Sequence, residues 1–521
     1  MAIWNKNDQD YIPGNKTLFE AFVTTDQYGT PAGAHGIGNA GEYSAFGEVV
    51  TAPLTPTFQL DALYGLDPQK FETFTSTGGS VDTDGPYMEV RSGTSQYGYG
   101  VLRSRRAVRY RPGQGAVTRF TAAFTAGVDG YTQRAGFFSQ EQALQIGFNG
   151  TQFGILRANG GKAHIHQLTI NTDTSGTESV TITLNGVATV LSVPSGTIAE
   201  NAKYIGEQSF PGWITESGPT YVRFLSTSVG PNAGAFTATV ASGTFAGTMT
   251  EIQTGVAHTE HWTYQADFNL DTLDGQGPSG VTIDATKLNV FQIDFRWLGA
   301  GEIRFAIENP LNGDLIFFHH IHYTNLNTTV HLDNPTLKVG YVAYSTGGTG
   351  TDVVVRGASI MGGIQGNIFF NTVTRSFPAE RNSGMNSAGT IYHLLSVHNR
   401  LILNNKINTR ELILSQISSG AVTAASTPVT MYLYFNQDIV GGHTHVPIDE
   451  SWSSAYYSTN ETTITQTVPP AFTFILQPGS TETIDLSPLR IVIPPNNHIT
   501  VAIKAAGVIS NAAATLTWIE D

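Results

Sequence analysis

The chain of 521 residues contains no cysteine. This absence excludes disulfide bonds, thiolate catalysis and cysteine metal ligands together. Charged residues are also scarce, at 13% of the chain, against about 25% in an average soluble protein. Lysine and arginine total 27 against 41 acidic residues, which gives a net charge of −14. We therefore expect no nucleic-acid partner, because the phosphate backbone attracts basic surfaces.

Long apolar runs are missing as well. No segment approaches the roughly 20 apolar residues of a membrane-spanning helix, so we expect no membrane span. Residues 1–15 lack the basic segment and apolar stretch of a secretory signal peptide. The sequence therefore predicts a soluble protein made in a cytoplasm.

The residues that replace the missing charges favour strands and turns. The chain has 56 glycines and is rich in threonine, serine and asparagine, while 40% of its residues are hydrophobic. This mixture suits short strands joined by tight turns and supplies few strong helix formers. At this length the chain should divide into about three or four domains. We expect an all-β, multi-domain protein.

The segment Asn289–Tyr323 shows the pattern of an all-β protein most clearly. Two glycine- or asparagine-containing turns separate three stretches of alternating apolar and polar residues, a pattern typical of an antiparallel meander. Phe305 is expected in the core, and Arg304 on the opposite face. The large apolar residues of the first stretch share one face: Phe291, Ile293, Phe295 and Trp297. That face predicts a second sheet covering it, as in a β-sandwich.

Changes in composition and in hydrophobic pattern along the chain predict four parts. Residues 1–85 are glycine-rich with short apolar pieces and are expected to form an extended arm for assembly or anchoring. Residues 86–161 and 256–365 form one discontinuous sandwich. Residues 162–255, rich in alternating threonine and valine, form an inserted small β-domain. Residues 366–521 form a C-terminal β-sandwich.

A cluster of arginines stands out in a chain so poor in cations. Phosphate binding and ion pairing are both compatible with it, and the acidic balance of the chain favours ion pairs at an interface. The spacing of four of them predicts one face of a strand: Arg103, Arg105, Arg109 and Arg111.

Catalytic signatures are missing from the sequence. It has no Gly-x-Ser-x-Gly, no His-Glu-x-x-His and no phosphate-binding loop motif. We therefore expect no catalytic residue, no cofactor and no enzyme activity. Glycan hydrolysis stays open, because two carboxylates from separate strands can meet in a cleft.

Three His-x-His pairs raise a metal hypothesis, since each would place two imidazoles on one face of a strand. No third ligand of obvious type lies near any pair, so we favour polar interface contacts and expect no metal site. The pairs are His164 and His166, His320 and His322, and His443 and His445.

Aromatic residues in a polar loop are candidates for a contact surface. Trp452, Tyr456 and Tyr457 lie in the segment SWSSAYYSTNETT, where no apolar periodicity predicts burial. Trp297, in contrast, is in phase with core residues.

Several segments resemble virion structural proteins of tailed bacteriophages and some large DNA viruses. They are Arg109–Phe124, Gly147–Arg157 and Asp294–Asn325. The resemblance covers residues 86–161 and 256–365 and implies a concanavalin- or laminin-G-like jelly roll. The inserted segment, with Pro211–Trp213 and Tyr221–Phe224, resembles small β-domains placed within phage proteins.

This resemblance implies a function without an activity. We expect a non-enzymatic virion component, such as a tail fibre, spike, capsid-surface or other appendage protein. Its partners would be other virion proteins and further copies of itself, a trimer being one option. A carbohydrate-binding adhesin that attaches to host-surface glycans is the alternative, and a glycan hydrolase or lyase is the third hypothesis.

Overall fold

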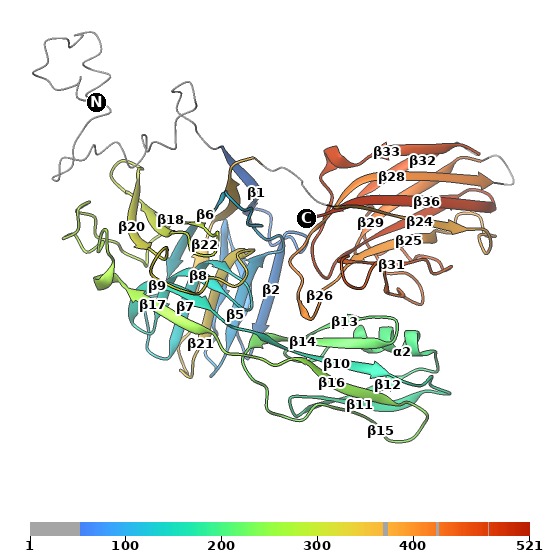
Figure 1. Cartoon of the computed structure of the whole chain (residues 1–521), viewed down its shortest axis with the longest axis horizontal. Helices are drawn as coiled ribbons and strands as arrows, with labels where there is room; N and C mark the ends of the chain where they lie inside the picture. Colours follow the sequence, from blue (N-terminus) through green and yellow to red (C-terminus); the bar gives the residue numbers. More distant parts are fainter. Residues whose placement is uncertain (1–52, 368–372, 424–426, 478) are drawn as a thin grey trace, which may run out of the picture. The chain divides into compact units, whose positions relative to one another are not determined.

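The computed structural model describes residues 53–367, 373–423, 427–477 and 479–521. The fold is nearly all β and contains several antiparallel sheets, as the composition predicts (Figure 1). A small unit comprises the described residues 53–55 and 365–367, in which the Thr55 hydroxyl donates to the carbonyl oxygen of Gly366 at 2.7 Å. None of the described helices is both long enough and apolar enough to cross a membrane.

The first sandwich consists of a nine-stranded and a seven-stranded sheet around one core. The nine-stranded sheet contains β1 (Leu54–Asp61), β3 (Ser80–Asp84), β4 (Tyr87–Arg91), β6 (Gly115–Phe124), β18 (Asn289–Arg296), β19 (Ile303–Glu308), β20 (Leu315–Ile321), β22 (Val354–Gly357) and β23 (Ser359–Gln365). The seven-stranded sheet contains β2 (Phe71–Ser76), β5 (Tyr99–Ser104), β7 (Tyr131–Phe138), β8 (Ala143–Asn149), β9 (Gln152–Asn159), β17 (Thr259–Tyr264) and β21 (Lys338–Ser345).

The predicted meander is strands β18, β19 and β20, which are consecutive neighbours in the nine-stranded sheet. Phe291, Ile293 and Phe295 are fully buried in the core, and Phe305 lies opposite Ile293 on β19. The predicted core face is therefore confirmed.

The opposite face of the meander is less open to solvent than the alternation indicates. Asp294 and Gln292 are buried there. Arg304 donates to Asp294 at 2.6 Å, and Arg119 on β6 donates to Gln292 at 2.7 Å. Burial of a carboxylate is tolerated when a cation pairs with it, and the neighbouring strands supply this cation.

The expected arm boundary at residue 85 needs correction. Residues 1–52 lie outside the described residues, but β2 pairs with β5 and β3 pairs with β4 inside the sandwich sheets. Phe71, at the start of β2, is buried in the main core. Short strands that contribute one or two core residues carry little periodicity, and this is why the segment is hard to recognise from its sequence.

The segment between β9 and β17 forms two sheets of its own, with a separate core. The four-stranded sheet contains β10 (Ala163–Ile170), β13 (Trp213–Ser217), β14 (Tyr221–Val229) and β16 (Gly247–Gln253). The three-stranded sheet contains β11 (Glu178–Leu184), β12 (Val187–Val193) and β15 (Thr237–Val240). Helix α2 (Ile198–Gly206) is capped at its N-terminus by Thr197, which exchanges hydrogen bonds with Glu200 in a capping box. Elsewhere in the described part of the chain lie two short 3₁₀ helices, η4 (Gln265–Asp267) and η5 (Ser487–Leu489).

The C-terminal part is a second sandwich with its own core, which includes the fully buried Trp518. Its five-stranded sheet contains β24 (Val373–Arg381), β28 (Leu412–Thr423), β33 (Thr481–Asp485), β34 (Val492–Ile493) and β36 (Ile509–Glu520). Its six-stranded sheet contains β25 (Tyr392–Asn399), β29 (Val429–Phe435), β30 (Val446–Pro447), β31 (Ala455–Ser458), β32 (Phe472–Leu476) and β35 (His498–Ala505). A small hairpin pairs β26 (Ile402–Leu403) with β27 (Lys406–Ile407).

Candidate metal centre

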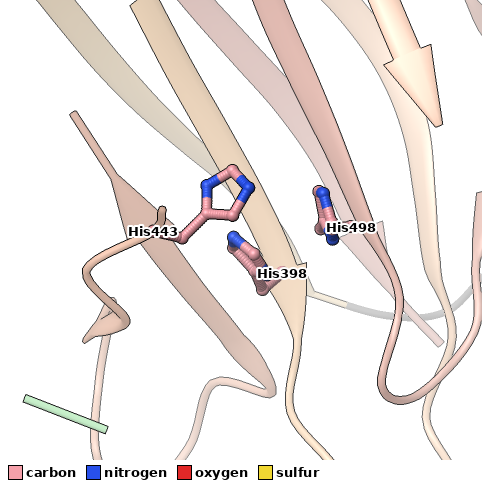
Figure 2. Close-up of side chains that lie close together, drawn as sticks. All are labelled: His398, His443 and His498. Atoms are coloured by element: carbon pink, nitrogen blue, oxygen red, sulfur yellow. The ribbon is translucent and has the colours of Figure 1, made fainter. Parts of the chain in front are cut away.

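Two histidines face each other on neighbouring strands of the six-stranded sheet. His398 lies near the end of β25 and His498 begins β35, and the antiparallel register places them directly opposite. Such cross-strand partners have Cβ atoms about 4.5–5.5 Å apart and point to the same face. Their rings stack with centroids 4.4 Å apart (Figure 2).

His443 joins this pair from the loop between β29 and β30. Gly441 and Gly442 precede it with φ angles of 76° and 71°, values that glycine adopts without steric cost. Thr444 holds the loop by donating from its hydroxyl to the side-chain oxygen of Asn460 at 2.9 Å. The ring of His443 lies 4.5 Å from that of His398 and 4.6 Å from that of His498 (Figure 2).

The three-histidine cluster (His398, His443 and His498) leaves ring nitrogens without partners. Nε2 of His398 and both nitrogens of His443 are buried and make no hydrogen bond within the described part of the chain. Nε2 of His498 lies 3.1 Å from the carbonyl oxygen of Gln437, so it carries the proton and leaves a lone pair on Nδ1. One ring nitrogen from each histidine lies within 4.8 Å of the other two.

A fourth histidine and a cavity lie beside the cluster. Nε2 of His445 is 3.2 Å from Nδ1 of His398, and this hydrogen bond fixes the orientation of the His398 ring. A cavity of about 170 Å³ is lined in part by the cluster, by His445 and by the exposed Asp438. It has room for water molecules, each of which occupies about 30 Å³ in the liquid.

The environment of the three-histidine cluster favours the neutral form of each imidazole. Burial lowers the pKa of His398 and His443 well below the ordinary histidine value, and repulsion from neighbouring imidazoles lowers it further. Burial also lowers the pKa of His498, against the opposing effects of the Gln437 carbonyl and Asp438. Neutral imidazole is the form of histidine that binds metal ions.

The pair on β10 is arranged differently. His164 and His166 share a face of the strand, as predicted, and their Nε2 atoms lie 3.0 Å apart in a mutual hydrogen bond. The backbone amide of Asn232 donates to Nδ1 of His164 at 3.3 Å. Glu251 is near, at 3.5 Å from His164 Nε2, but exposed. These contacts already engage both nitrogens of His164.

The third pair belongs to an ion-pair network at the surface. His320 and His322 lie 3.0 and 3.4 Å from the same carboxylate oxygen of Glu302. Arg296 pairs with the other oxygen of Glu302 at 3.1 Å. His322 is largely exposed, and solvent competes with any ligand there.

The arginines of the predicted strand face do not share a strand, because β5 ends at Ser104. They pair with carboxylates of this same chain: Arg103 and Arg105 with Glu72 at 2.8 and 3.9 Å, and Arg109 and Arg111 with Asp521 at 3.8 and 2.5 Å. The predicted ion pairs to a neighbouring subunit are thus replaced, in the isolated chain, by internal ones.

The aromatic residues expected at a contact surface separate in the structure. Trp452 is 70% exposed. Tyr456 is buried, with its hydroxyl 2.6 Å from that of Tyr221. Tyr457 is half-buried and stacks on Phe377 with ring centroids 3.8 Å apart. The alternation of β31, which the polar loop composition conceals, turns Tyr456 inward.

Sequence reasoning identifies His443 but not its two partners. His398 and His498 are separated by about a hundred residues, and only the pairing of β25 with β35 brings them together. His443 and His445 also precede β30 rather than lying within a strand. Comparison of the sequence with models of known protein families and with curated proteins finds no match.

Proposed function

We propose that the chain is a non-enzymatic structural component of a virion, such as a fibre, spike or other surface protein, that assembles into homo-oligomers. The support is the position of the segments that resemble virion proteins. Arg109–Phe124 contains β6, and Asp294–Asn325 contains β19, β20 and the C-terminal end of β18 from Asp294 to Arg296. These four strands are neighbours in the order β20-β19-β18-β6.

The third such segment completes the argument. Gly147–Arg157 contributes the end of β8, the turn that follows and most of β9, in the facing sheet of the same sandwich. Segments separated by more than a hundred residues thus build one folded unit. Three resembling segments that meet in one sandwich favour a shared fold over scattered chance similarity, and the proposed role rests on that resemblance.

Two measurements test this proposal. Mass photometry and negative-stain electron microscopy of the purified chain should show a discrete oligomer with repeated, symmetric projections. Mass spectrometry of gradient-purified virus particles from the sample that carries the gene should detect the chain. A chain that is monomeric at every concentration and missing from the particles contradicts the proposal.

A carbohydrate-binding adhesin is the second candidate, and an aromatic pair favours it. Trp262 and Tyr264 on β17 stack nearly parallel, with ring centroids 6.2 Å apart. Glu260 and Arg134 lie beside them as polar groups, paired at 3.3 Å. Aromatic faces rimmed by polar groups suit sugar rings. Glycan-array binding that Trp262→Ala abolishes would support this function; an array without signal would count against it.

A further inference from the structure

We propose that His398, His443 and His498 bind one divalent transition-metal ion, Zn²⁺ foremost, with water in the remaining position. The geometry is the first reason. Zinc–nitrogen bonds are about 2.0–2.1 Å long, so two imidazole nitrogens on one tetrahedral ion lie about 3.3 Å apart. The three candidate nitrogens already lie within 4.8 Å of one another, and binding requires the stacked rings of His398 and His498 to rotate until their in-plane lone pairs converge on the ion.

The unpaired nitrogens are the second reason. His443 is 4% exposed, and neither of its ring nitrogens makes a hydrogen bond of good geometry within the described residues, although the Gln437 backbone lies near enough to raise the pKa of His443 against the effect of burial. Nε2 of His398 is likewise buried and unpaired. Native proteins pair the large majority of buried polar atoms, so three such nitrogens in one place require an explanation. A bound cation supplies the partner that the chain does not.

The surroundings of the ligands are the third reason. The Gln437 carbonyl accepts from Nε2 of His498 and leaves the lone pair of that ring on Nδ1, while His445 engages Nδ1 of His398 and leaves Nε2 for the ion. Metal-binding histidines in proteins commonly have such an outer hydrogen bond, which fixes the ring. In the pair on β10, by contrast, the Nε2 atoms of His164 and His166 are hydrogen-bonded to each other.

The donor set decides the class of ion. Imidazole nitrogens suit Zn²⁺, Ni²⁺ and Cu²⁺, whereas Ca²⁺ and Mg²⁺ require oxygen ligands. The adjacent cavity, about 170 Å³, leaves room for a water ligand. The ion would join the loop before β30 to the paired strands β25 and β35, and so cross-link parts of a sandwich that contains no disulfide. This inference does not depend on the proposed virion role.

The test uses the full chain, stripped of metal with EDTA and dialysed. Calorimetric titration with Zn²⁺ should show one tight site per chain, and Zn²⁺ should raise the melting temperature. Substitution by Co²⁺ should give the visible absorption of a four-coordinate site. Loss of an outer-shell partner alone weakens metal binding by about 10–100-fold, so His443→Ala should weaken it by at least about 100-fold.

His322→Ala is the matched control, because it removes a histidine from the exposed Glu302 group and should leave the tight site unchanged. His498→Gln provides a second ligand variant at a half-buried position, should His443→Ala fail to fold. Unchanged affinity in a folded ligand variant overturns the proposal, as does a site lost in His322→Ala instead. A wild-type melting temperature that responds to neither EDTA nor Zn²⁺ overturns it whichever variants fold.

Discussion

Lys338 donates a 2.8 Å hydrogen bond to Glu72 although a strand separates the two residues in the sheet. Lys338 begins β21 and Glu72 lies in β2, with β5 between them. Arg103 on the intervening β5 donates to the other oxygen of Glu72 at 2.8 Å. With Arg105 at 3.9 Å, one largely buried carboxylate therefore balances three cations at the edge of the first sandwich.

Glu72→Gln should destabilise the sandwich by about 3 kcal/mol, because it leaves Lys338, Arg103 and Arg105 without their counter-charge. Urea denaturation measures the change in the free energy of unfolding. Lys70→Ala is the control: its pair with Asp67 is exposed and 3.9 Å long, so its loss should cost less than about 0.5 kcal/mol. Adding Lys338→Met to Glu72→Gln should restore part of the loss. If Glu72→Gln and Lys70→Ala lowered the free energy of unfolding equally, the proposed role of Glu72 would be wrong.

The same residues predict how stability depends on pH. Burial alone would raise the pKa of Glu72, but Lys338 and Arg103 outweigh it and lower the pKa from 4.5 to about 2. As the pH falls, the Glu72 carboxylate therefore takes up its proton in the unfolded chain before it does so in the folded chain. The free energy of unfolding decreases as the pH falls from about 4.5 towards 2. Glu72→Gln lacks this contribution, so its difference from wild type should shrink over that interval. A difference that stays constant down to pH 2 would refute this account.

Lys338 should act at the opposite end of the pH scale. Burial lowers its pKa from 10.5 to about 8 in spite of the attraction of Glu72. Between those values the unfolded chain binds more protons, so the contribution of Lys338 to stability rises with pH. Urea denaturation from pH 8 to 10 should show this rise in wild type relative to Lys338→Met. The same slope in both proteins would exclude it.

Truncation at two positions tests the corrected N-terminal boundary. A chain beginning at residue 53 should keep a cooperative melt, since it retains strands β1 to β3. A chain beginning at residue 85 loses β2, with the buried Phe71 and Glu72, and should melt at a markedly lower temperature or aggregate. Differential scanning calorimetry compares the two. If both melt alike, residues 54–84 do not belong to the sandwich body.

The chain beginning at residue 53, compared with the full chain, separates folding from assembly. Light scattering of the full chain and of the chain beginning at residue 53 reports the oligomeric state of each. If residues 1–52 hold the subunits together, as the proposed arm would, the shorter chain should fold but dissociate. An unchanged oligomer would place the assembly contacts in the sandwiches.

Local patterns in the sequence predict strands and their core faces well. The alternation of Phe291, Ile293 and Phe295 defines one face without reference to any other part of the chain, and the structure buries that face. Threonine, valine and aromatic residues between glycine turns likewise determine the all-β class. The capping box of Thr197 and Glu200 was an equally local signal for α2, and an all-β composition obscured it.

Contacts between distant strands cannot be predicted in this way. The alternation that places Asp294 opposite the core does not reveal that Arg304 and Gln292 enclose it. The three-histidine cluster depends on the register of β25 against β35 and on one loop. A shift of one residue in that register would turn His498 to the other face, so the site exists only at the level of the assembled sheet.

Substitutions in the meander test its two faces. Phe305→Ala should cost about 3–5 kcal/mol, as for other buried phenylalanines. Arg304→Ala should cost about 2–3 kcal/mol, more than an exposed arginine, because Asp294 is left buried and unpaired. Arg296→Ala, whose side chain is 63% exposed, is the control and should cost less than about 1 kcal/mol. Urea denaturation of the three variants measures these values.

A double variant shows why Arg304→Ala lowers the free energy of unfolding. Asp294→Asn removes the charge that Arg304 neutralises, so Arg304→Ala should cost less in that background than in wild type. Additive costs would mean that Arg304 acts through its packing over the Phe317 ring, 4.9 Å from the guanidinium carbon, rather than through Asp294.

Excision of residues 162–255 should leave the first sandwich folded. Lys162 and Val256 exchange backbone hydrogen bonds of 2.8 and 2.9 Å, so the ends of the inserted segment already meet. The flanking strands β9 and β17 are antiparallel neighbours, with Asn159 opposite Thr259. A Gly-Ser linker between residues 161 and 256 therefore turns them into an ordinary hairpin, and the first sandwich loses no strand because the excised strands form separate sheets with a separate core.

Amide hydrogen exchange of β7, β8 and β9 measures whether the sandwich survives the excision. These strands should retain their protection, while Leu401 and Ile402, which pack against Ile165 and Leu225 of the inserted segment, should become exposed. Leu401→Ser in the excised chain reduces that new apolar patch and should improve solubility without changing protection in β7 to β9. The matched control is a chain with the same linker inserted at Gly313, a turn with φ of 80° outside the core, which should exchange like wild type. Loss of protection in β7 to β9 after excision, with the control intact, would show that the inserted segment is part of the sandwich core and not a domain of its own.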